Sequence, residues 1–366
     1  SRDSISSKCK IHKISEVSKE KLSPFYKKLY PERYKSLTEN WNWWYRVNKD
    51  FAEPIILSLD GKVIGQAAFL VNNLIVSNKK IPAIWFQDYA VLPEFMGTGL
   101  GKLLTKEWMK VCPNQMAMCS PYSLRVLKKF GWIDNFETKR LVRPINYLKF
   151  VPFANKLSLN LFDSALRFFL KKRYAENDNI KPYNLSENFK VISDSFNLKK
   201  MPENNEDYAI INRDESWLNW RLMECPYKKD IYFFEYQNSF SIVHIYSVKK
   251  IKRLNILYTY STDNSEETKI YKLITNWAIN NDIDFVWAIS KRKDLKNIFP
   301  KIYYRPLRFA SWSSDSSIFS ILKKGFLDLQ GIDSDIESGF YCLLYTSPSP
   351  RDQRGSGLAG CGWKKK

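Results

Sequence analysis

Glycines at three alternate positions, Gly97, Gly99 and Gly101, have the spacing in this 366-residue chain that best suits ligand binding. They follow an apolar run over 84–91 that predicts a buried strand, and they precede leucines and a tryptophan spaced as one face of a helix. Glycine allows positive φ angles and lets a ligand approach the backbone closely. The first turn of a helix also has N–H groups without internal partners and the positive end of the helix dipole. The turn therefore predicts an anion site, most naturally for phosphate.

Two common phosphate-binding motifs do not fit this turn. A Walker loop needs a glycine five residues before Gly101 and a hydroxyl after the lysine, but Met96 and Leu103 stand at those positions. A dinucleotide-binding fingerprint needs a third glycine where the chain has Lys102 or Leu104. The expected phosphate ligand is therefore of another class.

Segment 91–104 (VLPEFMGTGLGKLL) resembles the acetyl-CoA motif of the GNAT N-acetyltransferase superfamily, Gln/Arg-x-x-Gly-x-Gly/Ala. Gly99 and Gly101 match the motif, whereas Met96 stands at the Gln/Arg position. The resemblance implies acetyl-CoA as co-substrate, with its pyrophosphate on backbone N–H groups of the turn and its pantetheine arm along the end of the strand. A glycine-rich turn without a ligand is the alternative. The residues implied to bind the cofactor are Ala90, Val91, Met96, Gly97, Thr98, Gly99, Leu100, Gly101 and Lys102.

A second segment, 123–132 (SLRVLKKFGW), resembles the Ala-x-x-Leu-Tyr-x-x-x-Gly-Phe motif of the same superfamily. Leu127 replaces the tyrosine that often protonates the departing thiolate in that family. Tyr122 and Ser123, at the start of the predicted helix, are therefore the candidate proton donors.

The resemblance implies direct acyl transfer from a thioester to an amine, which requires a base for the amine and donors for the oxyanion. Asp88 is the candidate general base, because strand alternation would aim it at the cleft, opposite in sense to Gln87. The alternative is that Asp88 caps a backbone group or pairs with a lysine. Cys119 has apolar neighbours, which favours a buried thiol over a nucleophile.

The order of predicted elements matches the GNAT fold, an α/β (α+β) arrangement of a mixed central sheet flanked by helices, over about residues 8–146. An Asp60-Gly61 dipeptide predicts the turn of a hairpin. The other expected elements are a strand at 9–14, two helices over 20–45, the hairpin strands over 54–76, a core strand at 84–91, a strand at 115–119, a helix from 121 and a last strand at 137–142.

The chain from 189 onward weakly repeats the first half, which predicts two tandem copies of the fold. Strands at 285–289 and 304–311 would complete the second copy. Its counterpart of the glycine turn, 264–271, contains no glycine, and Glu266 and Glu267 open the helix. A phosphate there would meet negative charge, so we expect the second copy not to bind CoA.

Four regions follow from these patterns. Residues 1–146 form the predicted acyl-CoA-binding domain, 147–180 a helical connector, 181–341 a degenerate second domain, and 342–366 a non-native tail. The helix of the connector ends in a basic cluster. The alternative interpretation of this helix is one that lies on a membrane surface. Residues 342–352 can be back-translated into a nucleotide string that resembles a transposase-based sequencing-library adapter. We therefore expect the natural sequence to extend only to about residue 341 of the given chain.

The formal net charge of +20 comes from lysines spread along the chain rather than from a dense basic block, so a solvated basic surface is favoured over nucleic-acid binding. The six cysteines contain no Cys-x-x-Cys pair, which argues against a metal site and favours a reducing, cytoplasmic compartment. No segment has the unbroken apolar length of a membrane span.

Three functions remain compatible with the sequence. The first hypothesis is an N-acetyltransferase that moves an acetyl group from acetyl-CoA to a primary amine of a small molecule or amino sugar. The second is a tRNA-dependent aminoacyl transferase of the peptidoglycan-bridge type, which the basic charge would suit. The third is a non-catalytic CoA-binding scaffold or sensor, which the missing tyrosine and the altered second copy would suit.

Overall fold

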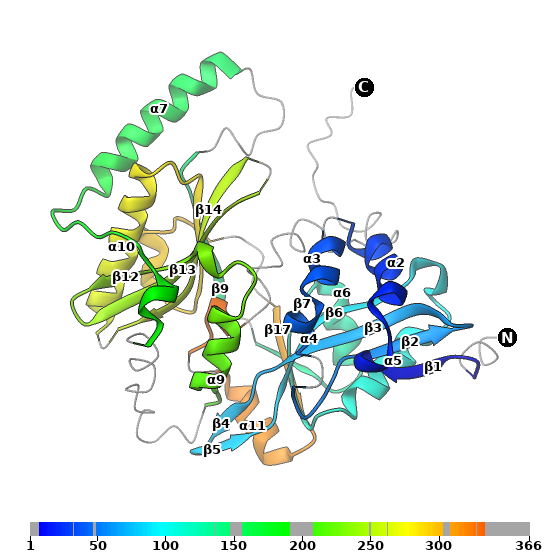
Figure 1. Ribbon diagram of the computed structural model, residues 1–366. Coiled ribbons are helices and arrows are strands. Elements are labelled where there is room, and N and C mark those ends of the chain that lie inside the picture. Colours follow the sequence, from blue (N-terminus) through cyan, green and yellow to red (C-terminus); the bar gives the residue numbers. More distant parts are fainter. Residues whose placement is uncertain are drawn as a thin grey trace, which may run out of the picture. The chain divides into compact units, whose positions relative to one another are not determined.

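The computed structural model describes residues 7–31, 33–46, 49–135, 137–146, 156–190, 208–248, 250–261, 263–302, 308–326 and 328–333. The chain forms two compact units, and neither is contiguous in sequence (Figure 1). Within the described residues, unit 1 comprises 7–134 and 308–324, and unit 2 comprises 135–302 and 325–333. The expected tail over 342–366 lies outside the described residues.

Unit 1 is built on a mixed sheet with the strand order β1-β2-β3-β6-β7-β17-β8. Strands β6 and β7 pair in parallel, whereas β1–β2, β2–β3, β3–β6 and β7–β17 are antiparallel. The strands are β1 (Lys10–Lys13), β2 (Ile55–Leu59), β3 (Lys62–Val71), β6 (Ile84–Val91), β7 (Asn114–Cys119), β17 (Arg308–Ser313) and β8 (Ile133–Asn135), with a small β4–β5 hairpin (Leu74–Val76, Lys79–Ile81). The expected turn at Asp60-Gly61 is confirmed, since both residues have positive φ (48° and 75°) between β2 and β3.

Helices cover both faces of the unit 1 sheet. They are α2 (Lys19–Leu29), α3 (Tyr34–Glu39), α4 (Trp41–Tyr45), α5 (Leu100–Met109), α6 (Pro121–Lys128) and α11 (Ser316–Lys324). Residues 20–45 were expected to form two helices and instead form three, because Asn40 leaves the helical conformation between α3 and α4. On α5, Trp108 is fully buried and stacks on Phe86 of β6, with ring centroids 3.5 Å apart, which fixes this helix to the sheet.

Unit 2 has the same kind of mixed sheet, in the order β10-β12-β13-β14-β15-β9-β16. Helix α10 (Asn264–Asn280) connects β14 to the parallel strand β15, as α5 connects β6 to β7 in unit 1. Helix α7 (Lys156–Arg173) lies within the predicted connector and packs through Leu166 and Leu170 on the core that α10 covers. The strands are β10 (Tyr183–Asn184), β12 (Ile231–Tyr236), β13 (Ser239–Val248), β14 (Ile251–Tyr260), β15 (Phe285–Ser290), β9 (Lys139–Pro144) and β16 (Lys301–Ile302).

Two strands lie in the opposite sheet from the one expected. The strand expected at 137–142 to finish the first copy is β9, which pairs antiparallel with β15 in unit 2. The segment expected at 304–311 to finish the second copy contains the start of β17, which pairs antiparallel with β7 in unit 1. Both strands fill the same position in their sheets, since β9 lies beside β15 and β17 lies beside β7. Their local sequences carry no signal that favours one sheet over the other.

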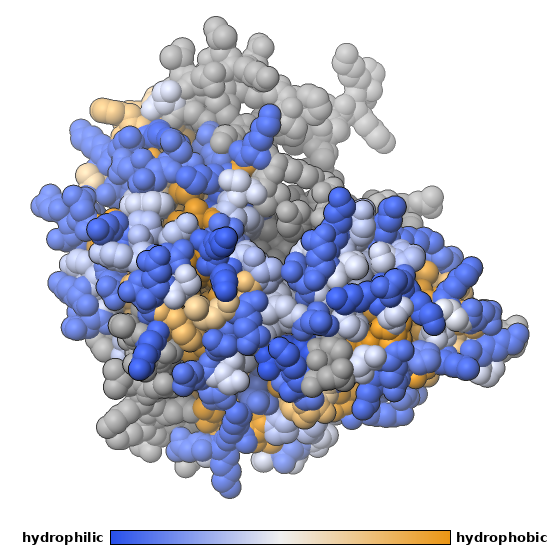
Figure 2. Space-filling view, in the orientation of Figure 1, coloured by the Kyte–Doolittle hydropathy of each residue, from blue (hydrophilic) through white to orange (hydrophobic). Residues whose placement is uncertain are grey.

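The visible surface of each unit is mostly hydrophilic (Figure 2), as expected for lysines dispersed along the sequence. None of the helices in the described part of the chain has the length and apolar character that crossing a bilayer requires.

Candidate functional site

Strands β6 and β7 pair for three residues and then separate. The parallel pairs are Ile84–Gln115, Trp85–Met116 and Phe86–Ala117, after which residues 87–91 of β6 have no pairing with β7. On its other side β7 stays paired with β17 as far as Cys119. The sheet therefore has a wedge-shaped gap at the carboxyl ends of β6 and β7, with its vertex at Phe86.

A bulge in β6 bends the strand away from β7 just beyond the vertex. Asp88 has a φ of 46°, in the left-handed region that non-glycine residues seldom adopt, and the register with β3 shifts between Gln66 and Ala68. Gln66 compensates this strain because its Nε2 donates to the Asp88 carbonyl at 3.2 Å. The bulge explains why the two parallel strands diverge here.

The glycine turn between β6 and α5 is open. Gly97 and Gly99 have φ values of 78° and 93°, and a Cβ atom at either position would meet nothing within 4 Å. The first α-helical hydrogen bond of α5 runs from the Leu103 N–H to the Gly99 carbonyl at 3.1 Å. Among the described residues, no hydrogen-bond partner is found for the N–H groups of Gly97, Gly99, Leu100, Gly101 and Lys102.

Two N–H groups expected to face the anion are used inside the turn instead. The Met96 N–H donates to the Pro93 carbonyl at 3.1 Å, and the Thr98 N–H lies 3.4 Å from the Phe95 carbonyl. The Met96 side chain, which replaces the Gln/Arg of the motif, is 49% exposed. The N–H groups that remain unpaired among the described residues are therefore those of Gly97 and of the first turn of α5, from Gly99 to Lys102.

Tyr89, which the sequence patterns did not single out, connects the strand to this helix. Its hydroxyl donates to the Gly101 carbonyl at 2.6 Å and lies 3.0 Å from Thr105 Oγ1. No local sequence pattern marks Tyr89, because the bulge that precedes it depends on tertiary contacts. Tyr89 fixes the start of α5, and with it the direction of the unpaired N–H groups.

The candidate base Asp88 is part of a buried network. Its Oδ1 accepts from Arg33 Nη1 at 2.9 Å and its Oδ2 from the Tyr45 hydroxyl at 3.1 Å, and the side chains of Arg33 and Asp88 are 6% and 1% exposed. Burial, and secondly the charge of Asp88, raise the pKa of Tyr45 well above its usual range, so this phenol stays protonated and donates. The partner of Asp88 is therefore an arginine rather than the lysine considered from sequence, and neither Arg33 nor Tyr45 was foreseen.

The other candidates lie where β7 passes into α6. The Ser120 side chain caps this helix by accepting from the Ser123 N–H at 3.1 Å, and the two serine hydroxyls are 3.0 Å apart. The side chain of Tyr122 lies outside the described part of the structure. Burial raises the pKa of the Cys119 thiol to about 12, which fits an inert thiol rather than a nucleophile.

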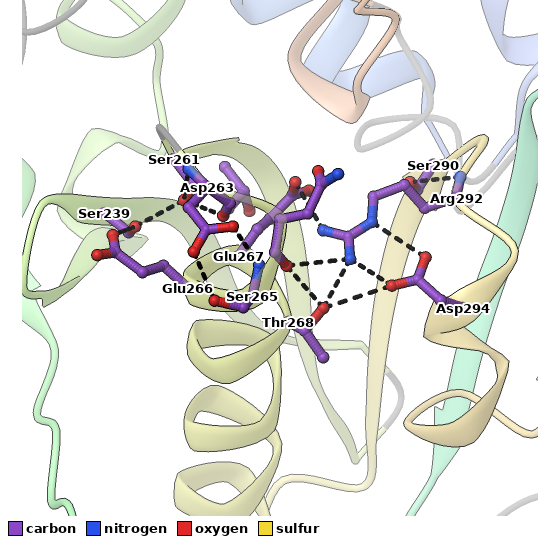
Figure 3. A network of polar contacts seen from close by, with 12 residues as sticks. Ser239, Ser261, Asp263, Ser265, Glu266, Glu267, Thr268, Ser290, Arg292 and Asp294 are labelled. Atoms are coloured by element: carbon purple, nitrogen blue, oxygen red, sulfur yellow. Dashed lines mark hydrogen bonds and ion pairs between the residues drawn. The ribbon is translucent and has the colours of Figure 1, made fainter.

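The corresponding helix start in unit 2 is occupied by its own side chains (Figure 3). Asp263 accepts from the Ser265 N–H at 2.9 Å, and Glu267 forms an ion pair with Arg292 at 2.7 Å. Arg292 Nη2 also donates to Thr268 Oγ1 at 2.6 Å. Carboxylates and a cap thus stand where unit 1 presents bare N–H groups, which gives a physical reason to expect no phosphate site here.

The gap between β14 and β15 in unit 2 is also filled. These strands pair from Arg253–Phe285 to Asn255–Trp287 and then separate. Gln330 Oε1 accepts from the Thr259 N–H at 2.7 Å, and Gln330 Nε2 donates to the Thr259 carbonyl at 3.1 Å. A Cβ atom on the next residue, Gly331, would lie 3.2 Å from the Ile256 carbonyl oxygen, so a side chain there would crowd the backbone of β14.

An ion pair holds the filling segment in place. Arg213 donates to both carboxylate oxygens of Asp333, at 2.7 and 2.6 Å, and to Asp328 Oδ2 at 3.2 Å. Asp333 in turn accepts from the Gln330 N–H at 2.8 Å.

Within the described residues, no group of three or more His, Cys, Asp or Glu side chains is arranged to hold a metal ion in either unit.

Residues 15–132 match the model of a family described as Acetyltransferase (GNAT) family. No curated protein matches the chain significantly. Solved structures resemble most of the chain at low identity. A GCN5-related N-acetyltransferase from Anabaena variabilis ATCC 29413 is 12% identical, with a TM-score of 0.52, over 83% of this chain and 72% of the other. A Saccharomyces cerevisiae N-myristoyltransferase with bound myristoyl-CoA is 14% identical, with a TM-score of 0.55, over 88% and 86%. These likenesses are ones of fold, and they extend over both units.

Proposed function

We propose that this chain, whose residues 15–132 belong to the GNAT acetyltransferase family, moves an acetyl group from acetyl-CoA to the primary amine of a small molecule or amino sugar. Membership of the family makes acyl transfer the reaction class. The observation that carries the proposal is the combination of an open gap beyond Phe86 with a glycine turn in which five N–H groups have no hydrogen-bond partner among the described residues.

The cofactor would lie across both features. Its pyrophosphate would accept from the N–H groups of Gly97, Gly99, Leu100, Gly101 and Lys102, where the helix dipole adds favourable charge. Its pantetheine arm would lie along the unpaired edge of β6, including Ala90 and Val91. The thioester would then reach the vertex of the gap, where the two strands come together.

The surroundings of the vertex favour a short acyl group. On one face, Phe86 stacks on Trp108, and Trp108 stacks on Trp132 with centroids 5.4 Å apart. On the other face, Trp85 is fully buried and lies 5.3 Å from the Phe309 ring. Close-packed aromatic rings leave little space for a long chain, which supports acetyl over longer acyl groups.

In the proposed reaction the amine nitrogen forms the new C–N bond, the C–S bond breaks, and the amine loses one proton while the thiolate gains one. Asp88 is proposed to accept the amine proton, because each of its oxygens accepts one hydrogen bond and retains a second lone pair. Ser123 and Tyr122, at the start of α6, are the proposed donors to the thiolate.

Calorimetry with CoA tests the binding step. Gly99→Glu places a carboxylate against the pyrophosphate and should weaken CoA binding by about tenfold or more. Gly61→Glu is a matched control, since Gly61 also has a positive φ and open space at its Cβ position but lies in the β2–β3 turn. It carries the same strain and charge and should bind CoA as the wild type does. Absence of heat for the wild type, or equal affinity in Gly99→Glu, would refute the proposal.

A further inference from the structure

Gln87 carries a buried amide without a partner at the vertex of the gap. It follows Phe86, the last β6 residue paired with β7, and it is 4% exposed. Neither its Oε1 nor its Nε2 has a hydrogen-bond partner among the described residues. Buried side-chain amides are normally satisfied, so two orphan groups on one residue require an explanation.

Two other buried glutamines of unit 1 each form hydrogen bonds through at least one amide atom. Gln115 Nε2 donates to the carbonyl of Cys112 at 2.8 Å and to that of Met109 at 3.2 Å. Gln66 accepts from the Tyr26 hydroxyl at 2.7 Å and donates to the Asp88 carbonyl. Gln115 Oε1 has no partner among the described residues, but Gln87 differs from both glutamines because neither of its amide atoms has one, and it lies at the gap.

The bulge places Gln87 and Asp88 on the same face of the sheet. Gln87 is the cross-strand partner of Ala68, and cross-strand partners project to one face. Ala68 shares its face with Gln66, two residues away, whose amide contacts Tyr26 and Tyr45. Gln87 therefore projects toward the Asp88 network, whereas the neighbouring Phe86 projects toward Trp108 of α5. The expectation that Asp88 and Gln87 point in opposite senses is wrong, because the left-handed residue interrupts the alternation.

This face is the one available to the acceptor. Under the proposed function, CoA approaches from the glycine turn and α5, so its thioester reaches the vertex from the Phe86 side. The amine must then attack from the opposite side of the sheet, where Gln87 presents its amide.

We propose that Gln87 selects acceptors whose amine stands next to an oxygen-bearing carbon, as in a β-amino alcohol or a 2-amino sugar. This inference rests on the proposed function and narrows its substrate class. A neutral amide takes no proton, so Gln87 binds rather than acts as a base. Its Oε1 accepts from the amine N–H, and its Nε2 donates to the adjacent oxygen. A group with one donor and one acceptor side by side satisfies both orphan atoms, whereas a simple alkylamine satisfies one.

The test compares two ring amines that differ at a single carbon, trans-2-aminocyclohexanol and cyclohexylamine. Thiol release from acetyl-CoA gives kcat/KM for each. The kcat/KM of the wild type should be about tenfold higher for the amino alcohol, because cyclohexylamine leaves the buried Nε2 donor of Gln87 unpaired. Gln87→Leu and Gln87→Glu, which both lack the Nε2 donor, should abolish that preference. Comparing the ratio between variants cancels the different basicities of the two amines.

Two further measurements separate this role from a structural one. Gln87→Leu should leave the affinity for CoA unchanged and should keep or raise the melting temperature, because it removes two unsatisfied buried groups. A wild type without preference, or a Gln87→Leu variant that keeps it, would overturn the inference while the acyltransferase proposal stands. A wild type that binds no CoA and releases no thiol with any amine would instead refute the proposed function, and this inference with it.

Discussion

Gln330 forms two hydrogen bonds with the backbone of Thr259, one to its N–H at 2.7 Å and one to its carbonyl at 3.1 Å. A side-chain amide thus satisfies the edge of β14 in the way an added strand would. Thr259 aligns in sequence with Ala90 of β6, whose edge toward β7 is unpaired. The two units therefore share a splayed pair of parallel strands, and they differ in that unit 2 fills the gap with its own chain.

Replacing Gln330 by Ala should destabilise unit 2 without creating a second cofactor site. We expect a loss of about 1–3 kcal/mol in the free energy of unfolding, because the buried Thr259 backbone loses both partners. CoA stoichiometry should stay unchanged, since Asp263 and Glu267 still occupy the start of α10. Urea unfolding and calorimetry measure the two effects. Gln237→Ala, at an exposed turn, is the control, and one additional CoA bound per chain would contradict the prediction.

The ion pair between Arg33 and Asp88 should be far more sensitive to substitution than a surface pair. Asp88→Asn leaves a buried guanidinium without its carboxylate, which we expect to cost about 3–5 kcal/mol of stability and to suppress turnover. Lys28→Ala, which breaks the exposed pair with Glu94, should cost about 1 kcal/mol or less. Urea unfolding of both variants checks the contrast, and equal losses would show that Asp88 does not depend on Arg33.

The same carboxylate can be examined in a double variant. Arg33→Met with Asp88→Asn removes the buried cation together with its partner, so it should be less destabilised than the sum of the single variants. A recovery of stability without recovery of turnover would support a role for Asp88 beyond holding the bulge. Additive losses would exclude direct coupling between the two side chains.

Tyr89 should affect CoA binding without carrying any cofactor contact of its own. Tyr89→Phe removes the hydroxyl that anchors Gly101 of α5, so the N–H groups of that turn lose their fixed direction. We expect CoA affinity to fall by about fivefold, the equivalent of one hydrogen bond, with little change in fold. Calorimetry measures the effect, and Tyr183→Phe, on an exposed strand of unit 2, is the matched control. Unchanged affinity would show that α5 holds its position without Tyr89.

His244 should make the protein sensitive to acid. It is buried between the rings of Tyr227 and Tyr246, and burial, with a smaller contribution from Arg221, lowers its pKa to about 3. The folded-state pKa lies below the unfolded value of 6.5, so stability is complete above pH 6.5 and is lost as the pH falls. Between pH 8 and pH 5 the loss should be about 2 kcal/mol.

His244→Phe keeps the ring stacking and should remove this acid sensitivity, which urea unfolding at each pH measures. His12→Gln, at the only other histidine in the sequence, is the control and should retain the wild-type slope. The same slope in His244→Phe and the wild type would exclude His244 as its source.

The sequence by itself determined the features that depend on neighbouring residues. The hairpin at Asp60-Gly61, the strand–turn–helix around Gly99 and the cap of α6 follow from local backbone preferences and from hydrophobic periodicity. The same local chemistry predicts that a glycine-free, acidic helix start in the second half is unsuited to a phosphate.

Only the tertiary structure decided which strands and side chains meet across the chain. The exchange of β9 and β17 between the sheets, the pairing of Arg33 with Asp88 and the filling of the unit 2 gap by Gln330 all join residues far apart in sequence. A strand pairs through backbone groups that every sequence possesses, so its local pattern does not specify its partner. The left-handed bulge at Asp88 likewise depends on Gln66 and Arg33, and it places the side chains of Asp88 and Gln87 on the same face of the sheet.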